Sequence, residues 1–186
     1  MGAPVSTHRF TLDEYHRMGE ADIFHEDDRV ELIDGQVVEM SPIGPAHAGC
    51  VTRLTALFAP LAGGAATLSI QNPVILAEYQ EPQPDVALLR YRADGYGTAH
   101  PQTADVLLVI EVAETSAHSD RRIKMPLYAR AGVPEAWLVD LPAEHLEAYR
   151  EPVAGRYMKV TTHVRGATLA PLALPDLEVS VDQVLG

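Results

Sequence analysis

Apolar and polar positions in the middle of this chain follow the pattern of buried β-strands. Two short runs rich in branched apolar residues, 86–89 and 106–110, predict two such strands. The polar stretch 94–104, which contains Gly and Pro, predicts the loop between them. A further apolar run at 136–140 predicts a third strand, so the centre of the chain predicts a sheet with little exposed surface.

The N-terminal part predicts a helix and then a hairpin. Segment 10–19 contains Thr11 followed by acidic residues, which is typical of a capped helix start. Two strand-like runs, 30–33 and 36–40, flank the pair Asp34-Gly35. Asp-Gly between two such runs is the strongest short-range hairpin signal, so we expect a β-hairpin here.

Two longer segments have the 3.6-residue apolar spacing of helices. Segment 46–61 predicts a helix that ends at Gly63-Gly64. Segment 119–131 also has a helical pattern, but it contains Pro126. Proline either kinks a helix or marks its first turn, and the sequence leaves both readings open.

The C-terminal part predicts further strands. Segments 146–150, 157–164 and 167–169 are expected to form a terminal meander, followed by a packed tail at 172–177. The order hairpin, helix, central strands, helix, strand, meander predicts an α+β or mixed α/β fold with a partly antiparallel sheet. We expect one domain over residues 1–186.

Composition narrows the class of protein. With 186 residues, 47% of them hydrophobic, the chain is long enough for one well-packed domain. The single cysteine, Cys50, excludes an intrachain disulfide and a multi-cysteine zinc site, and it suits a reducing compartment. No apolar run approaches the roughly 20 residues that span a bilayer. We therefore expect a cytoplasmic protein without a membrane partner.

The net charge of −12, from 14 basic and 26 acidic residues, argues against a broad surface for nucleic acid. Phosphate recognition normally needs clustered Lys and Arg, because counterion release dominates non-specific affinity. The densest basic group is Arg121, Arg122, Lys124 and Arg130. This group predicts either a local basic cleft or an ordinary solvated helix face.

Two acidic residues stand at the ends of the predicted central strands. Asp85 opens the first run and Glu111 closes the second. Buried carboxylates are costly to desolvate unless something compensates their charge. A divalent cation is the usual compensation, and one or two carboxylates suffice for Mg²⁺. The pattern predicts a metal-assisted reaction at one edge of the sheet.

An ordered series of motifs resembles the Uma-type putative restriction endonuclease family, within the PD-(D/E)XK nuclease superfamily. The resemblance covers nearly the whole chain. It rests on Arg29-Val30-Glu31-Leu32-Ile33-Asp34-Gly35, Met40-Ser41-Pro42, Gln83-Pro84-Asp85-Val86, Val109-Ile110-Glu111-Val112, and the run from Asp120 through Lys124, Tyr128, Gly132 and Glu135 to Asp140. The resemblance implies a restriction endonuclease-like mixed sheet flanked by helices, with an N-terminal hairpin and a C-terminal meander.

The resemblance also implies a site. Asp85 and Glu111 would be the metal-binding carboxylates, and Glu31 an additional acidic residue beside the metal. The parent fold places a lysine two residues after the glutamate, where this chain has Ala113. Lys124 matches the lysine that replaces it in this family, so we expect Lys124 to complete the catalytic set.

Simpler readings exist for these residues. Asp85 after a proline also suits a turn at the start of a strand. Glu111 also suits a buried ion pair with an Arg or Lys. Lys124 lies four residues after Asp120, which is the spacing of an ordinary helical ion pair.

Glu31 and two accessory candidates also have simpler readings. Glu31 has Arg29 or Arg53 as alternative ion-pair partners. His47, at the start of the predicted helix, is expected to contact phosphate or the metal region, or else to cap the helix or face solvent. Gln83 either positions groups at the site or is an ordinary loop residue.

The resemblance implies a Mg²⁺- or Mn²⁺-dependent endonuclease that hydrolyses DNA and acts as a homodimer, since cutting two strands needs two active centres. Two other functions fit the sequence. One is a non-catalytic nuclease-fold binding module, which the net charge and Ala113 favour. The other is a metal-dependent hydrolase of another phosphodiester.

Overall fold

The computed structural model describes residues 6–25, 27–61 and 64–186. The helices are α1 (Leu12–Glu20), α2 (Pro45–Phe58), α3 (Ala117–Arg122), α4 (Lys124–Ala131) and α5 (Val181–Leu185). The strands are β1 (Val30–Ile33), β2 (Gln36–Glu39), β3 (Thr67–Ile70), β4 (Val86–Leu89), β5 (Val106–Ala113), β6 (Glu135–Asp140), β7 (His145–Val153), β8 (Arg156–Val164), β9 (Thr168–Leu169) and β10 (Val179–Ser180). Short 3₁₀ turns follow α2 and precede β5.

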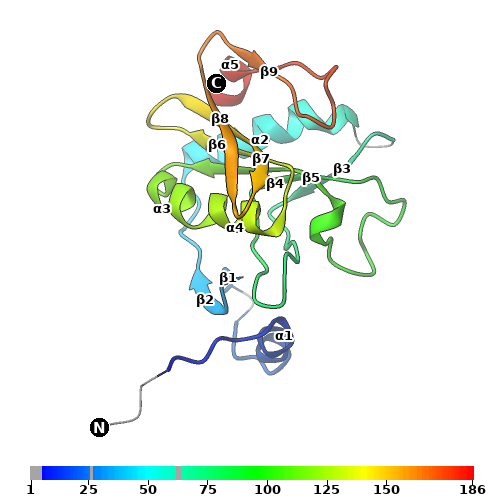
Figure 1. Ribbon diagram of the computed structural model, residues 1–186, viewed down its shortest axis with the longest axis vertical. Coiled ribbons are helices and arrows are strands. Elements are labelled where there is room, and N and C mark those ends of the chain that lie inside the picture. Colours follow the sequence, from blue (N-terminus) through cyan, green and yellow to red (C-terminus); the bar gives the residue numbers. More distant parts are fainter. Residues whose placement is uncertain (1–5, 26, 62–63) are drawn as a thin grey trace.

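A six-stranded mixed sheet in the order β3-β4-β5-β6-β7-β8 forms the centre of the molecule (Figure 1). β5 and β6 are parallel, and the other neighbouring pairs are antiparallel. β6, β7 and β8 follow one another as a meander, while β1 and β2 form a separate hairpin. These features confirm the predicted fold class, a mixed sheet flanked by helices with an N-terminal hairpin and a C-terminal meander.

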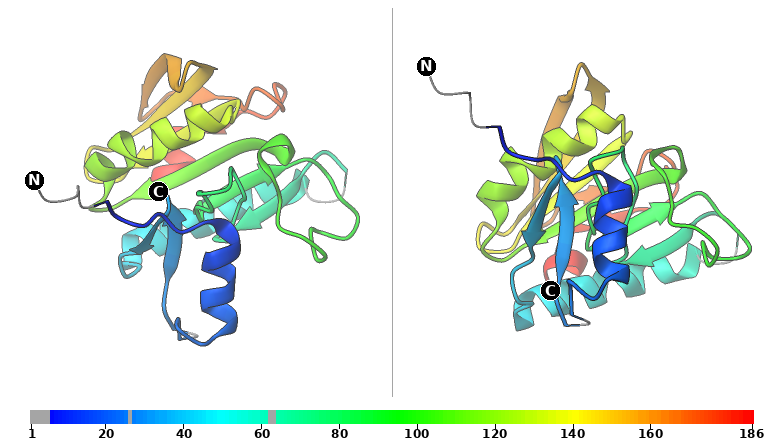
Figure 2. Two further views of the ribbon diagram at one scale, coloured as in Figure 1. Left: turned by 60° about the horizontal axis from the view of Figure 1, so that its bottom comes forward. Right: turned by 90° about the horizontal axis from the view of Figure 1, so that it is seen from below.

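Helices cover both faces of the sheet, and each face has its own core. Along β4, Val86 and Leu88 pack in the core under α2, whereas Ala87 and Leu89 pack in the core under α4. This alternation follows from the two-residue period of a strand. Cys50 of α2 is fully buried in the first core. α2 and α4 lie on opposite sides of the sheet in Figure 2.

The hairpin and α1 lie together at one end of the molecule (Figures 1 and 2). Thr11 and Glu14 form a reciprocal capping box at the start of α1, as the sequence predicts. Asp34 and Gly35 turn the chain with φ of 49° and 77°, the left-handed conformation that this tight hairpin needs. A Cβ on Gly35 would lie 2.7 Å from Arg9 Cβ, so the turn also needs the missing side chain.

The predicted helix at 119–131 is two helices. The chain breaks at Ile123, which has φ −111° and ψ −62°, and α4 starts at the next residue. Pro126 therefore lies in the first turn of α4, where its missing N–H has no intrahelical acceptor. The first-turn reading of Pro126 is correct.

Three other boundaries differ from the prediction. β5 continues two residues past Glu111 to Ala113, because its neighbour β6 pairs with it that far. Segment 167–169 does not extend the meander: β9 pairs with β10, and a short helix, α5, follows. The helix predicted at 46–61 starts at Pro45 and ends at Phe58, before a 3₁₀ turn. Gly63, predicted to end it, lies outside the described residues.

Over the residues that the structure describes, no helix has the length and apolar character needed to cross a membrane.

Candidate active site

Asp85 and Glu111 come to the same end of the β4–β5 pair. Asp85 directly precedes Val86, the first residue of β4, and Glu111 directly follows Ile110, the partner of Val86 on β5. Both residues line one cavity. Both carboxylates are buried, with 6% and 3% of their surface exposed. The sequence predicted that these two strands are neighbours with a carboxylate at the end of each, and β4 and β5 do pair.

Three donors surround the Asp85 carboxylate. Its Oδ2 accepts hydrogen bonds from the Val112 amide at 2.9 Å and lies 3.0 Å from His47 Nε2. Its Oδ1 accepts from Gln71 Nε2 at 3.2 Å. Burial works to raise the pKa of Asp85, but His47, Val112 and Gln71 together hold that pKa below its usual value. Asp85 is therefore a fixed, ionised carboxylate.

The pKa of Glu111 is shifted in the opposite direction, upwards. Burial and the neighbouring carboxylates Asp85, Asp120 and Glu31 raise its pKa to about 8, and Lys124 offsets only part of this rise. Lys124 Nζ lies 3.3 Å from Oε1 of Glu111. Lys124 thus compensates only part of the negative charge of Glu111. An additional positive charge beside Glu111 would therefore be stabilised.

Lys124 bridges two acidic residues from distant parts of the chain. Its Nζ lies 3.2 Å from Glu31 Oε2 as well as 3.3 Å from Glu111 Oε1. Burial works to lower the pKa of Lys124, yet Glu111 and Glu31 hold it above its usual value, so the ammonium stays charged. The break at Ile123 separates Lys124 from α3, and its ion-pair partners are Glu31 and Glu111 rather than Asp120.

Glu31 lies on β1 with 5% of its surface exposed. Besides Lys124 it accepts a hydrogen bond from the Gln83 amide at 3.1 Å. Neither alternative partner is the one used: Arg29 donates to the Ser41 carbonyl, and Arg53 donates to carbonyls at the C-terminal end. The hairpin thus brings Glu31 beside β4 and β5, where Lys124 and the Gln83 amide hold its carboxylate.

The two accessory candidates have different places. His47, in the first turn of α2, lies in the cavity with Nε2 against Asp85, while its Nδ1 is buried without a partner among the described residues. Gln83 donates from its side chain to the Val30 carbonyl at 2.9 Å, and so it fixes the loop before β4 to β1. His47 lies at the centre of the site, and Gln83 supports it from outside.

The polar residues that the sequence reasoning did not assign to the site include Gln71, Glu114, Asp120 and Tyr128, which contact its carboxylates or line its cavity. The Tyr128 hydroxyl donates to Glu111 Oε1 at 2.5 Å, and Asp120 is buried with its Oδ2 accepting from Ser116 at 2.6 Å. For Tyr128 the available signal was its spacing four residues after Lys124, because such residues fall on one helix face, here that of α4.

A cavity of about 590 Å³ lies between the hairpin, the start of α2, the end of β5 and the α3–α4 segment. Of the residues described above, its lining includes Glu31, His47, Asp85, Glu111, Glu114, Asp120 and Lys124. Seven carboxylates line it: Glu31, Asp34, Glu39, Asp85, Glu111, Glu114 and Asp120. Two permanently charged cations, Arg29 and Lys124, stand against them. The cavity is strongly acidic.

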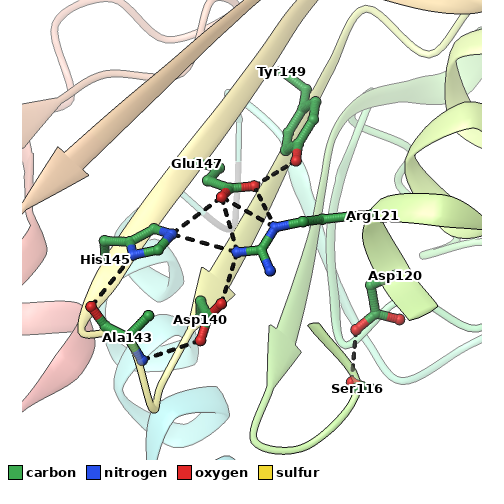
Figure 3. A network of polar contacts seen from close by, with 8 residues as sticks. All are labelled: Ser116, Asp120, Arg121, Asp140, Ala143, His145, Glu147 and Tyr149. Atoms are coloured by element: carbon green, nitrogen blue, oxygen red, sulfur yellow. Dashed lines mark hydrogen bonds and ion pairs between the residues drawn. The ribbon is translucent and has the colours of Figure 1, made fainter. Parts of the chain in front are cut away.

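Arg121, one member of the basic group predicted near the site, makes its contacts outside the cavity. Arg121 reaches from α3 to β6 and β7, where it contacts Asp140 at 2.7 Å and Glu147 at 2.8 Å (Figure 3). His145 lies 3.1 Å from the same Glu147 carboxylate. Figure 3 also shows Asp120, the preceding residue, pointing away from this cluster towards Ser116. Arg121 therefore anchors α3 to the sheet.

Comparisons with known proteins agree with this architecture. The Uma2 family model, described as "Putative restriction endonuclease", matches residues 12–182. Among solved structures, a putative nuclease belonging to DUF820 from Anabaena variabilis ATCC 29413 is similar, with a TM-score of 0.71 and 16% sequence identity. The match covers 95% of this chain and 97% of the other. No curated protein sequence matches this chain.

Proposed function

This chain belongs to the Uma2 family of putative restriction endonucleases, and from that membership we propose that it is a metal-dependent endonuclease that hydrolyses DNA phosphodiester bonds. The observation that carries the proposal is the arrangement of Asp85, Glu111 and Lys124: two buried carboxylates with an ammonium 3.3 Å from one of them, in one cavity. Family membership supports a nuclease, and this arrangement supports the way it would work.

The residues fit Mg²⁺ or Mn²⁺. Asp85 and Glu111 would hold the ion through carboxylate oxygens, which are the ligands that Mg²⁺ prefers. Over the part of the chain that the structure describes, no three His, Cys, Asp or Glu side chains converge as a full metal site. Two carboxylates are sufficient for Mg²⁺, which keeps several waters. The excess of carboxylates over cations in the cavity also favours a divalent cation.

A bound divalent cation would polarise the scissile phosphate and lower the pKa of a bound water. The protein's own groups would do the rest. The Lys124 ammonium lies where it can stabilise negative charge that builds on the phosphoryl oxygens. Glu31 would hold Lys124 in that place, and Tyr128 would hold Glu111. In the hydrolysis, the water oxygen bonds to phosphorus, the bond to the leaving sugar oxygen breaks, and that oxygen takes up a proton.

Ala113 bears on the main alternative, a binding module without catalysis. A nuclease of the parent fold that lacks its lysine would lose the cation beside the glutamate. Here Lys124 supplies an ammonium next to Glu111 from a different element. This observation favours the catalytic function over the binding module. The same site would serve a hydrolase of another phosphodiester, so the substrate needs a direct test.

We further propose that residues 1–186 act as one domain, and that two copies would cooperate if both strands of a duplex are cut, since each copy carries one centre.

The test is nicking of supercoiled plasmid in Mg²⁺ or Mn²⁺, comparing the wild type with Glu111→Gln. The matched control is Glu81→Gln, because Glu81 is similarly buried, at 4% exposure, but contacts His16 outside the cavity. Nicking that is lost in Glu111→Gln and kept in Glu81→Gln would support the proposal. Equal nicking in all three preparations would come from a contaminant and would contradict it, as would the absence of nicking in every metal.

A further inference from the structure

Three exposed aliphatic side chains converge on the cavity. Val38, Ile43 and Ile123 have 37%, 42% and 46% of their surface exposed, and all three line the cavity. They come from β2, from the loop after it and from the break between α3 and α4. Exposed apolar residues that gather at one place mark binding surfaces, whereas scattered ones are ordinary. We call these three residues the apolar patch.

The apolar patch adjoins the proposed catalytic groups. Val38 is the direct cross-strand partner of Glu31 in the hairpin, so both project to the same face, with Cβ atoms about 5 Å apart. Alternate residues of both strands line the cavity from this face: Arg29, Glu31, Ile33, Gln36, Val38 and Met40. Ile123 directly precedes Lys124. A group bound on the patch would thus lie beside the Lys124–Glu31 ion pair.

The charges around the cavity do not suit a continuous duplex. Duplex affinity comes from neutralising many phosphates with Lys and Arg. The cavity offers Arg29 and Lys124 against seven carboxylates, and Lys124 already pairs with Glu31 and Glu111. Arg29 has no ion-pair partner within the described ranges and donates to the Ser41 carbonyl. A single cation such as Arg29 suits a single phosphate. Arg29 lies two residues before Glu31 and projects to the same face of the hairpin.

We propose that the apolar patch binds one unpaired base of a single DNA strand, with the adjoining phosphodiester at Asp85 and Glu111. This inference rests on the proposed function and names its substrate class. An unpaired base exposes an apolar face that packs on apolar side chains, whereas a paired base keeps that face inside the stack. A cavity of about 590 Å³ is in the range for one small ligand unit. Arg29 would contact a neighbouring phosphate.

The experiment measures binding and cleavage side by side. A short fluorescein-labelled DNA strand and its blunt duplex are compared by fluorescence anisotropy in Ca²⁺ and by cleavage in Mg²⁺. The wild type is compared with the double variant Val38→Ser, Ile123→Ser. Val160→Ser, an equally exposed aliphatic change on β8 at 50% exposure, is the matched control. Melting temperatures establish that each variant is folded.

We expect the single strand to bind about tenfold more tightly than the duplex, and the double variant to lose about tenfold in single-strand affinity, because the base then loses its apolar packing surface. Val160→Ser should match the wild type. Equal or tighter duplex binding, or an unaffected double variant, would overturn the inference even if plasmid nicking still depends on Glu111. If strand binding still depends on the apolar patch but no DNA is cleaved, the proposed nuclease activity is wrong and the base-binding site stands.

The other occupant to test for the apolar patch is a second copy of the chain. Sedimentation of the same proteins tests it. A wild-type dimer that becomes monomeric in Val38→Ser, Ile123→Ser would assign the apolar patch to a second copy of the chain and overturn the inference.

Discussion

The Tyr128 hydroxyl donates a hydrogen bond to Glu111 Oε1 at 2.5 Å, and both residues are buried. Burial and the nearby Glu111 charge raise the pKa of Tyr128, so the hydroxyl keeps its proton and remains a donor. The Lys124 ammonium contacts the same carboxylate from another direction. Glu111 is therefore held by two groups from successive turns of α4, so the position of that helix fixes the glutamate.

Replacing Tyr128 with Phe should weaken this hold. We expect Tyr128→Phe to lower the free energy of unfolding by about 1–2 kcal/mol, because one buried hydrogen bond is lost. Metal-dependent cleavage should fall about tenfold, as is typical when a group that orients a metal ligand is removed. Urea unfolding and plasmid cleavage measure the two effects. Tyr157→Phe is the control, because its hydroxyl donates to the Val133 carbonyl outside the cavity; a matching loss of activity there would contradict the prediction.

Divalent cations should stabilise the folded protein. A ligand that binds only the folded state raises the melting temperature, so Mg²⁺ or Mn²⁺ should raise it and EDTA should reverse the rise. Differential scanning calorimetry measures this without any substrate. Asp85→Asn and Glu111→Gln should each abolish the shift, whereas Glu81→Gln should keep it. A shift that survives in Glu111→Gln would place the cation elsewhere.

Lys124 should matter for stability as well as for activity. Lys124→Met keeps the length of the side chain but leaves Glu31 and Glu111 without their shared cation. Removing one member of a buried ion pair destabilises a protein by about 3–5 kcal/mol, and we expect the lower end of that range because Glu111 can take up a proton. Chemical denaturation measures it, with the exposed Lys159→Met as control. A change under about 1 kcal/mol would show that Lys124 is not a structural cation.

The contribution of Glu147 should depend on pH. Burial works to raise its pKa, but Arg121, Tyr149 and His145 hold that pKa below its usual value. A carboxyl whose pKa is lowered on folding stabilises the protein above its unfolded pKa and loses that effect as the pH falls. Glu147→Gln should therefore cost about 1–3 kcal/mol at neutral pH, and the gap to the wild type should narrow in acid. Urea unfolding over a pH series measures it. A gap that stays constant, as expected for the exposed control Glu151→Gln, would contradict the prediction.

The hairpin turn should not accept a side chain at Gly35. Gly35→Ala adds a Cβ that would meet Arg9 Cβ at 2.7 Å, with φ at 77°. We expect a loss of about 2 kcal/mol or more, since both the clash and the left-handed backbone oppose alanine. Gly95→Ala isolates the backbone effect, because Gly95 has φ of 59° and open space around it. Thermal unfolding compares the two, and equal losses would show that the contact with Arg9 is unimportant.

Features set by neighbours in sequence could be predicted. The Asp34-Gly35 hairpin and the capping box at Thr11 depend on a few adjacent residues. That β4 and β5 are neighbours followed from two short apolar runs joined by a loop, because consecutive strands commonly pair in a sheet.

Features that need long-range contacts could not be predicted. The resemblance assigned Glu31 and Lys124 to one site, but their ion pair joins residues 93 positions apart. Nothing local to Glu31 distinguishes it from a residue paired with Arg29. The partners of Arg53 lie at the C-terminal end, on a short helix with too few residues for a clear period. The α3–α4 break at Ile123 was hidden because the apolar spacing continues across it.

The buried position of Cys50 has a practical consequence. It is the single cysteine of the chain, and burial raises the pKa of its thiol to about 11. A thiol that is neither exposed nor ionised at neutral pH reacts slowly with maleimides and other thiol reagents. The natural chain is thus already a background for single-site labelling. A cysteine introduced at Thr115, which is exposed and lines the cavity without belonging to the apolar patch, would carry the sole fluorophore and report when a DNA strand enters the cavity.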